Sequence, residues 1–242
     1  MPATKTITTP SLRGVNLVKT YGDGDARRTT LHEVTIDLFP GQLVLLMGPS
    51  GSGKSTLLAV LSGLLEPDSG QVLAEDDGRL LDVWHLTPKQ REEYRRRNTG
   101  FIFQGYNLFP ALTARQQLEI VLKWGSGASS GDARNRSEEM LSKLGLLKNK
   151  NKKPALMSGG EKQRVAIGRA LVKNPNFVFA DEPTSALDWE NGEKVIELLR
   201  DAAHERKASI LVVSHDHRIL PFVDVYYHLE DGHLERRPLP QH

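Results

Sequence analysis

The segment 48–55, with the sequence Gly-Pro-Ser-Gly-Ser-Gly-Lys-Ser, has the residue types and spacing of a loop that cradles phosphate groups. Its glycines allow backbone N–H groups to curl toward an anion, and a helix that follows them adds the positive end of its dipole. Lys54 is placed to neutralise the β- and γ-phosphate oxygens of a nucleotide, and Ser55 to ligate the magnesium ion that bridges those oxygens. The segment therefore predicts a site for a nucleoside triphosphate with magnesium.

The flanking residues distinguish such a site from a flexible Gly/Ser linker. The apolar run 43–47 before the loop has the pattern of a buried strand, and the leucine-rich run 56–61 after it has the pattern of a helix. Linkers are not normally flanked in this way, which favours the phosphate site. The residues predicted to bind the nucleotide here are Gly48, Pro49, Ser50, Gly51, Ser52, Gly53, Lys54, Ser55 and Thr56.

Two adjacent carboxylates, Asp181 and Glu182, follow the apolar run 177–180. A strand over that run would deliver them to its carboxyl end, which is the edge where α/β sheets bind ligands. Neighbouring strand residues point in different directions, so Asp181 is predicted to hold magnesium and Glu182 to orient and polarise an attacking water. The alternative is an ordinary acidic turn after a strand.

A second anion-binding turn is indicated by the segment 157–166, Met-Ser-Gly-Gly-Glu-Lys-Gln-Arg-Val-Ala. Ser158 suits a helix N-cap, and Gly159 and Gly160 leave the first turn open to an anion. A plain N-capped amphipathic helix is the alternative. The segment resembles the signature motif of ATP-binding cassette (ABC) ATPases, with Met157 where leucine is usual, and the resemblance covers nearly the whole chain in the expected order.

Resemblance to that family implies a homodimer in which two cassettes sandwich two ATP molecules head to tail. The signature of one copy then completes the phosphate loop of the other, which assigns nucleotide contacts to Ser158, Gly159, Gly160 and Glu161. The segment 185–188 resembles the loop that crosses the dimer interface, with Asp188 as its anchor, although Asp188 also suits a helix N-cap. Trp189 stands where a small polar residue is commoner, either to bulk out the interface or to cover the following helix.

Three further residues match the family's motifs. Gln104 resembles the glutamine that touches magnesium and reports nucleotide state to a helical subdomain, Tyr21 the aromatic that stacks on adenine, and His215 the switch histidine that contacts the γ-phosphate. The alternatives are a surface glutamine, a turn tyrosine, and a metal site that His215 shares with His217. The predicted catalytic residues are Glu182, His215, Lys54 and Gln104. The predicted magnesium ligands are Ser55, Gln104 and Asp181.

The segments 99–104, 107–108 and 112–114 are similar to the ATPases of lipoprotein-release, macrolide-export and heterocyst-type glycolipid exporters. This similarity implies a separately encoded permease, a place on the cytoplasmic face of the inner membrane, and export or extraction of a lipid, lipoprotein or drug-like cargo. A soluble ABC ATPase that acts on nucleic acid or the ribosome is the competing class, but the chain has neither a long heptad insertion nor a second cassette. The candidate permease contact is the apolar set Tyr106, Leu108, Phe109 and Leu112, with core packing as its alternative.

The elements that would position these residues alternate between strand-like and helix-like segments, which predicts an α/β fold with a mainly parallel sheet. Strands are predicted over 12–20, 31–38, 43–47, 71–74, 100–103, 177–180, 210–213 and 223–229. Helices are predicted over 54–63, 88–97, 112–145 with a break at 125–131, 159–173 and 190–206. The family resemblance adds a P-loop NTPase (RecA-like) core, an antiparallel β subdomain and an α-helical insert. One ABC ATPase domain is expected over 1–242, with a flexible tail at 1–10, the core and β subdomain at 11–104 and 158–235, and the helical subdomain at 105–157.

Composition sets limits on partners and compartment. The 242 residues contain no cysteine, which fits the cytosol, and the net charge of +2 does not indicate the strongly positive field that captures nucleic acid. No apolar run approaches the roughly 18 residues that span a bilayer, so a membrane task requires a partner. The basic clusters 95–97 and 148–153 are expected to be solvated, and 236–242 to be a loosely ordered end.

Overall fold

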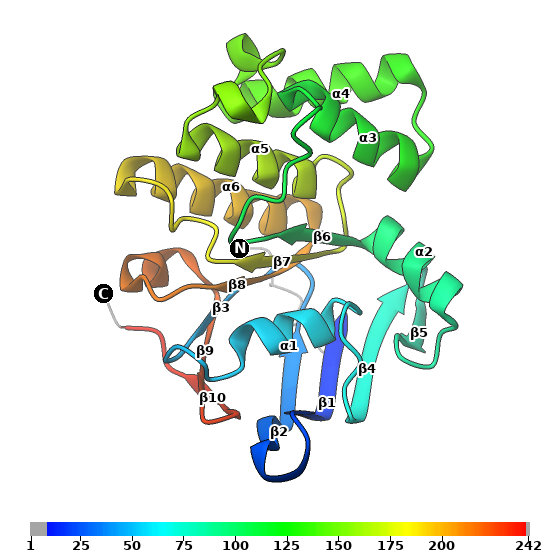
Figure 1. Ribbon diagram of the computed structural model, residues 1–242, viewed down its shortest axis with the longest axis vertical. Coiled ribbons are helices and arrows are strands. Elements are labelled where there is room, and N and C mark those ends of the chain that lie inside the picture. The colour runs from blue at the N-terminus through cyan, green and yellow to red at the C-terminus, as the bar shows by residue number, and fades with distance from the viewer. Residues whose placement is uncertain (1–8, 241–242) are drawn as a thin grey trace, which may run out of the picture.

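The computed structural model describes residues 9–240, apart from the side chain of Asp25, and shows two sheets with helices around them (Figure 1). Most of the predicted flexible tail at 1–10 lies outside the described residues. The central sheet has six strands in the order β10 (His233–Arg237), β9 (Val225–Glu230), β3 (Leu43–Met47), β8 (Ser209–Val213), β7 (Phe177–Asp181) and β6 (Thr99–Ile102). All neighbouring strands in it are parallel except β10 and β9, so the predicted mainly parallel sheet is confirmed.

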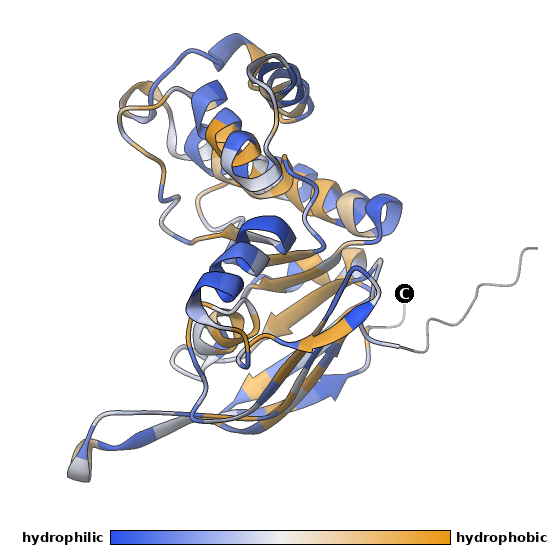
Figure 2. Cartoon of the chain, turned by 90° about the vertical axis from the view of Figure 1, so that its right-hand side faces the viewer, coloured by the Kyte–Doolittle hydropathy of each residue, from blue (hydrophilic) through white to orange (hydrophobic). Residues whose placement is uncertain are grey.

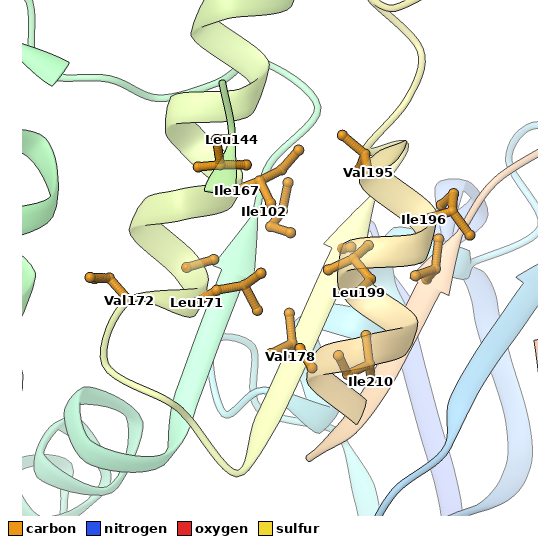
Figure 3. Close-up of a cluster of buried hydrophobic side chains, with 14 of the residues drawn as sticks. Ile102, Leu144, Ile167, Leu171, Val172, Val178, Val195, Ile196, Leu199 and Ile210 are labelled. Carbon is orange, nitrogen blue, oxygen red and sulfur yellow. The ribbon is translucent and has the colours of Figure 1, made fainter. Parts of the chain in front are cut away.

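The central strands β3, β7 and β8 are largely apolar, as expected for a parallel sheet that is covered on both faces. In β3, Leu43 and Leu45 belong to the core formed with α5 (Gly159–Leu171) and α6 (Trp189–Arg206), whereas Val44 and Leu46 belong to the core formed with α1 (Lys54–Leu61). Figure 3 shows side chains of α5 and α6 gathered over β6, β7 and β8. Figure 2 shows hydrophobic residues concentrated in these layers and hydrophilic residues on the outer helices. The strands of the central sheet are therefore buried from both faces.

A second, antiparallel sheet packs on the α1 side of the molecule. Its strands lie in the order β2 (Arg28–Leu38), β1 (Leu12–Tyr21), β4 (Ser69–Asp76) and β5 (Arg79–Asp82). Leu12, Leu17 and Leu31 of this sheet are fully buried in the same core as the residues of α1. The predicted antiparallel β unit is therefore present beside the parallel sheet.

Two strands, β5 and β10, were not predicted from the sequence. Each pairs with the strand before it across a two-residue Asp-Gly turn, at 77–78 and 231–232, in which both residues have positive φ. Such turns match the twist of the flanking strands, which makes Asp-Gly a strong hairpin signal. The expectation of a loosely ordered end over 236–242 is wrong for Arg236 and Arg237, which pair with β9.

The remaining helices are α2 (Pro88–Asn98), α3 (Ala114–Ser126) and α4 (Ser130–Lys143). α2 begins as predicted, because the Thr87 hydroxyl caps it and Pro88 occupies its first turn. The predicted helical stretch divides at Gly127, whose φ of 64° ends α3. The limits of the helical subdomain, at 105 and 157, stay a prediction. Short 3₁₀ segments lie at η1 (Gly24–Ala26), η2 (Leu147–Asn149), η3 (Pro154–Leu156) and η4 (His217–Phe222). Among residues 9–240, no helix is long and apolar enough to cross a membrane.

The first basic cluster is not simply solvated, because each of its guanidinium groups has an acceptor within the chain. Arg95 donates to the carbonyl oxygen of Gly63 at 2.7 Å, and Arg96 donates to the carbonyl oxygen of Trp124 at 2.9 Å. Arg97 pairs with Asp76. These contacts tie α2 to the end of α1, to α3 and to β4.

The second basic cluster is tied to the helices through Glu138 of α4. Its carboxylate contacts Lys150 at 2.8 Å, Arg115 at 3.2 Å and Arg134 at 3.3 Å. These three cations, Lys150 foremost, lower the pKa of Glu138 to about 2 from its ordinary value of 4.5. The carboxylate thus joins α3, α4 and the segment before the signature turn.

This depressed pKa predicts an acid-sensitive contribution to stability. Because the carboxylate has a lower pKa in the folded chain, its contribution is complete above pH 4.5 and is lost as the pH falls toward 2. We expect Glu138→Gln to lower the melting temperature at neutral pH, and the difference from the parent to shrink below pH 4.5. Calorimetry across this pH range measures it. Glu139→Gln, which loses only an exposed contact with Lys143, is the control; a difference independent of pH would contradict the prediction.

Candidate functional site

The glycine-rich segment 48–55 leads from β3 into α1, and two of its glycines, Gly48 and Gly53, are sterically required. A Cβ atom on Gly48 would lie 1.9 Å from the carbonyl oxygen of Leu229, and one on Gly53 would lie 2.7 Å from the carbonyl oxygen of Thr30. Both glycines also have positive φ, 149° and 104°. The loop is therefore wedged between β9 and β2, and its backbone leads directly into the N-terminus of α1.

A cavity of about 440 Å³ lies over this loop at the carboxyl ends of β3, β6, β7 and β8. It brings together predicted residues from four separate stretches of the chain, in agreement with the rule that parallel sheets bind ligands at this edge. Two lining residues were not predicted, Thr30 of β2 and Val213 of β8, and neither carries a recognisable motif. The full lining is Thr30, Gly48, Ser50, Gly51, Gly53, Lys54, Ser55, Thr56, Gln104, Asp181, Glu182, Val213 and His215.

Lys54 supplies the positive charge of the cavity. Its ammonium group donates to the carbonyl oxygens of Gly48 at 2.8 Å and Pro49 at 2.7 Å, which leaves one of its three N–H groups for another acceptor. Burial lowers the pKa of Lys54, while the nearby carboxylates of Glu182 and Asp181 act in the opposite direction. The loop thus holds its own lysine beside two acidic groups.

Glu182 is held in an uncommon backbone conformation, with φ of 50°. Its N–H donates to the carbonyl oxygen of Val213 at 2.9 Å, which ties the turn after β7 to β8. One carboxylate oxygen lies 3.0 Å from Nδ1 of His215, and the other accepts from the Ser214 hydroxyl at 3.4 Å. The carboxylate is 13% exposed and the imidazole 78% exposed, so a fixed acid faces a solvent-facing histidine.

The hydrogen bond from His215 to Glu182, together with the negative charge of Glu182, raises the pKa of His215. The protonated imidazole therefore persists to higher pH than in a free histidine. His217 lies in η4 instead of beside His215, and residues 9–240 contain no group of three or more His, Cys, Asp or Glu placed to hold a metal ion. The local partner of His215 is a carboxylate.

The three predicted magnesium ligands line the same cavity. Ser55 contributes a hydroxyl, Gln104 an amide oxygen and Asp181 a carboxylate. Magnesium prefers oxygen ligands and usually keeps several waters, so a few protein oxygens beside a phosphate site suit it. The donor set of this cavity fits the ion.

Tyr21 lies beside the cavity and does not line it. Its ring is 45% exposed at the end of β1, and its hydroxyl is 3.3 Å from the hydroxyl of Thr56, which follows the phosphate loop. The exposed aromatic face stands near the start of α1, where a base attached to a bound triphosphate could reach it. The adenine contact stays a prediction.

The signature turn lies apart from the cavity, since none of Ser158, Gly159, Gly160, Glu161 or Asp188 lines it. Ser158 caps α5 with a reciprocal pair of bonds: its hydroxyl accepts from the N–H of Glu161 at 3.2 Å, and Glu161 accepts from the N–H of Ser158 at 2.9 Å. Asp188 caps α6 through Asn191. Within one copy of the chain, Ser158 and Asp188 therefore act as helix N-caps.

A second, apolar hollow opens beside the loop that follows Gln104, in two adjoining cavities of about 370 and 390 Å³. The four residues of the candidate permease contact differ in burial. Leu108 packs against the core, Tyr106 and Leu112 are half-buried, and Phe109 is 50% exposed. Trp124, 68% exposed at the end of α3, was not predicted because an isolated tryptophan in a helical pattern carries no motif. The aromatic residues that line the hollow are Phe101, Phe103, Phe109 and Trp124.

Comparison with known proteins agrees with this geometry. Residues 31–185 match the family described as ABC transporter. The chain is 38% identical over 225 residues to the ABC transporter ATP-binding protein MJ0796 of Methanocaldococcus jannaschii, covering 91% of this chain and 94% of that protein. It is 36% identical over 225 residues to the macrolide export ATP-binding/permease protein MacB of Brucella melitensis, covering 93% of this chain but 34% of MacB.

Solved structures agree as well. A dimeric, post-hydrolysis structure of the MJ0796 cassette bound to ADP and Pi is similar with a TM-score of 0.87 and 36% identity, over 96% of this chain and all of that one. A second dimeric structure of MJ0796 gives a TM-score of 0.88 at 35% identity, with the same coverage. Similarity at this level extends from the sequence to the arrangement of the elements.

Proposed function

The chain belongs to the ABC transporter ATP-binding family and is an ATPase, and from this premise we propose that it works as a homodimer that powers a separately encoded membrane permease. The hydrolysis that would power the permease is supported by one observation. Lys54, Gln104, Asp181, Glu182 and His215 line the same cavity over the phosphate loop. Each of these side chains has a role in phosphoryl transfer, a reaction that asks the protein mainly for charge and position.

The phosphate loop and Lys54 bind the triphosphate. Backbone N–H groups at the start of α1 point toward the cavity end of the helix, where its dipole favours an anion. The free N–H of Lys54 reaches the terminal phosphates as a compact positive charge. Ser55, Gln104 and Asp181 would hold a magnesium ion, which would supply further positive charge beside the bound phosphates.

Glu182 and His215 act on the attacking water and the γ-phosphate. The hydrogen bonds from His215 and Ser214 fix the Glu182 carboxylate, so it can orient a water and take its proton. The contact raises the pKa of His215, which favours the cationic imidazole, and that form is suited to a phosphate oxygen. Acid and base are therefore placed as a pair at one end of the cavity.

A second copy of the chain completes the site. The signature turn offers the open first turn of α5, but it does not line the cavity of its own copy. A head-to-tail partner would bring Ser158, Gly159 and Gly160 over the nucleotide. The ADP- and Pi-bound structure of a relative is dimeric, which supports the association of two copies.

The apolar hollow beside Gln104 is our candidate permease contact. The segment 104–109 begins in the nucleotide cavity and ends at Phe109 in the hollow. Arg169 of α5 donates to the carbonyl oxygens of Tyr106, at 2.9 Å, and Asn107, and so fixes this segment between the two sites. A partner in the hollow therefore lies within a few residues of a predicted magnesium ligand.

The proposed permease partner also implies where the chain acts and what class of cargo is moved. We place the chain on the cytoplasmic face of the inner membrane, with a lipid, lipoprotein or drug-like cargo, since MacB is named for macrolide export and joins an ATP-binding part to a permease. Action on nucleic acid or the ribosome is the second candidate. It is disfavoured because Arg95, Arg96 and Arg97 of α2 have acceptors within the chain, as do Lys150 and Lys152 of the second basic cluster.

Charging the hollow should separate basal hydrolysis from hydrolysis stimulated by the permease. We expect Phe109→Asp to remove most of the stimulation, by about tenfold or more, because a buried unpaired charge weakens an apolar contact strongly. Basal hydrolysis should stay within about twofold of the parent. The measurement compares the ATPase rate of the chain alone with its rate beside a candidate permease reconstituted in lipid.

The matched control is Leu80→Asp, which charges an exposed apolar residue of β5, outside both cavities. It should leave both rates unchanged. Equal loss of basal and stimulated hydrolysis in the Phe109 variant would contradict docking in the hollow. Failure of the wild-type chain to associate with the permease or to be stimulated by it would overturn the proposed partner.

A further inference from the structure

Trp189, the first residue of α6, packs against two residues of η4, Phe222 and Arg218. Its ring meets Phe222 edge-on, with ring centres 6.3 Å apart, and packs against the core under α6. The Arg218 guanidinium lies over the ring, 4.5 Å from its centre. A stacked guanidinium is held by the electrostatics of the aromatic face, which an aliphatic residue cannot supply.

Arg218 is in turn fixed to the segment that carries the switch histidine. Its guanidinium makes a two-pronged contact with Asp216, with Nε to Oδ1 at 2.9 Å and Nη2 to Oδ2 at 2.8 Å. The N–H of Asp216 donates to the Ser214 hydroxyl at 3.2 Å, and that hydroxyl donates to Glu182 at 3.4 Å. A continuous set of contacts thus runs from the Trp189 ring to the carboxylate beside His215.

These contacts hold both ends of the 183–188 segment on the same short stretch of chain. Glu182, at one end, contacts Ser214 and His215, and Trp189, at the other end, contacts Arg218. The segment between them contains the residues predicted to cross the dimer interface. Movement at that interface therefore cannot displace Trp189 without pulling on the stretch that orients Glu182.

We propose that Trp189 and Arg218 are positioning residues that couple the start of α6 to the Glu182–His215 pair through Asp216. The inference rests on the roles given to Glu182 and His215 in the proposed function. Neither Trp189 nor Arg218 touches the nucleotide cavity, so their effect is on the orientation of the pair and not on nucleotide affinity.

The test uses Trp189→Leu, which keeps apolar cover for Phe222, Arg218→Met, which keeps the length of the side chain, and the double variant. Each single variant should lower kcat for ATP about fivefold, with the KM changed less than about twofold, because ground-state binding is untouched. The double variant should lose no more than either single one, since both break the same contact. Arg218→Lys, which keeps a cation for Asp216 but not the planar face, should recover part of the rate.

Arg200→Met is the matched control. Arg200 lies over the ring of Phe222, 5.7 Å from its centre, but has no contact with Asp216, so its loss should leave kcat unchanged. Three results would each overturn the coupling. They are a kcat of the single variants within about twofold of the parent, additive losses of kcat in the double variant, and an equal loss of kcat in the control.

A second measurement decides the coupling without turnover. In the nucleotide-free protein, the NMR signals of the His215 ring, assigned with His215→Gln, should shift in Trp189→Leu and Arg218→Met and stay in place in Arg200→Met. Unchanged His215 signals in the first two variants would overturn the coupling. If the Glu182→Gln variant hydrolysed ATP at the native rate, the role of Glu182 in the proposed function would be overturned. The NMR measurement would be unaffected by that result, so the two failures are distinguishable.

Discussion

Replacing Glu182 by Gln is expected to reduce the ATPase rate by about 100-fold or more, which is the usual contribution of a positioned general base. The amide is nearly isosteric with the carboxylate and keeps a hydrogen-bonding oxygen for Ser214, but it cannot accept the proton of the attacking water. ATP binding should persist, because the phosphate loop and Lys54 are unchanged. Steady-state phosphate release and filter binding of ATP measure the two effects.

The same variant should accumulate as a dimer when ATP and magnesium are present, since it binds nucleotide but does not hydrolyse it. Light scattering with and without ATP measures the molar mass of the variant and so distinguishes monomer from dimer. Glu190→Gln, which changes an exposed acid paired with Lys194 at the start of α6, is the control and should behave as the parent. Native turnover by the Glu182 variant would show that another group activates the water.

Two inactive variants are expected to restore activity when they are mixed. Lys54→Ala removes the positive charge that faces the triphosphate, and Gly159→Asp puts a negative charge in the open turn of α5. Each variant alone should therefore hydrolyse ATP about 100-fold more slowly than the parent. If each site combines one copy's phosphate loop with the other copy's signature turn, a mixed dimer holds one intact site. Random pairing then returns about a quarter of the parent activity.

The aspartate in this experiment is chosen so that folding is preserved. An acidic residue in the first turn of a helix is favoured by the dipole, and a Cβ at Gly159 meets only the end of the Tyr106 side chain, at 3.2 Å. Gly131→Asp, in the first turn of α4 with open space around it, is the control and should be active. A mixture no more active than its components would show that both halves of a site belong to one chain.

Much of the site's geometry could be predicted because its signals are local. The 48–55 segment displays its glycines, lysine and serine in one short motif, and the caps at Thr87 and Ser158 lie where capping residues precede helical patterns. The fold class and the parallel sheet followed from apolar runs alternating with helical ones. These features depend on a few adjacent residues, which a single sequence displays.

The features that were missed depend on pairing between distant residues or on weak patterns. β5 and β10 are edge strands with exposed, charged residues, so they lack the apolar pattern, and only their Asp-Gly turns marked them. Thr30 enters the cavity because β2 lies against Gly53, and Trp124 reaches the hollow because α3 packs beside α2. Neither neighbour can be read from local sequence.

Helix α5 has a mechanical consequence. Its first turn presents Gly159 and Gly160, and ten residues later Arg169 grips the backbone of Tyr106 and Asn107, about 15 Å along the axis at 1.5 Å per residue. Both features belong to one unbroken helix, so a tilt of the helix moves them together. If a second copy contacts the first turn of α5 while a partner fills the hollow, one continuous helix joins the two contacts, and a shift at either contact is expected to reach the other.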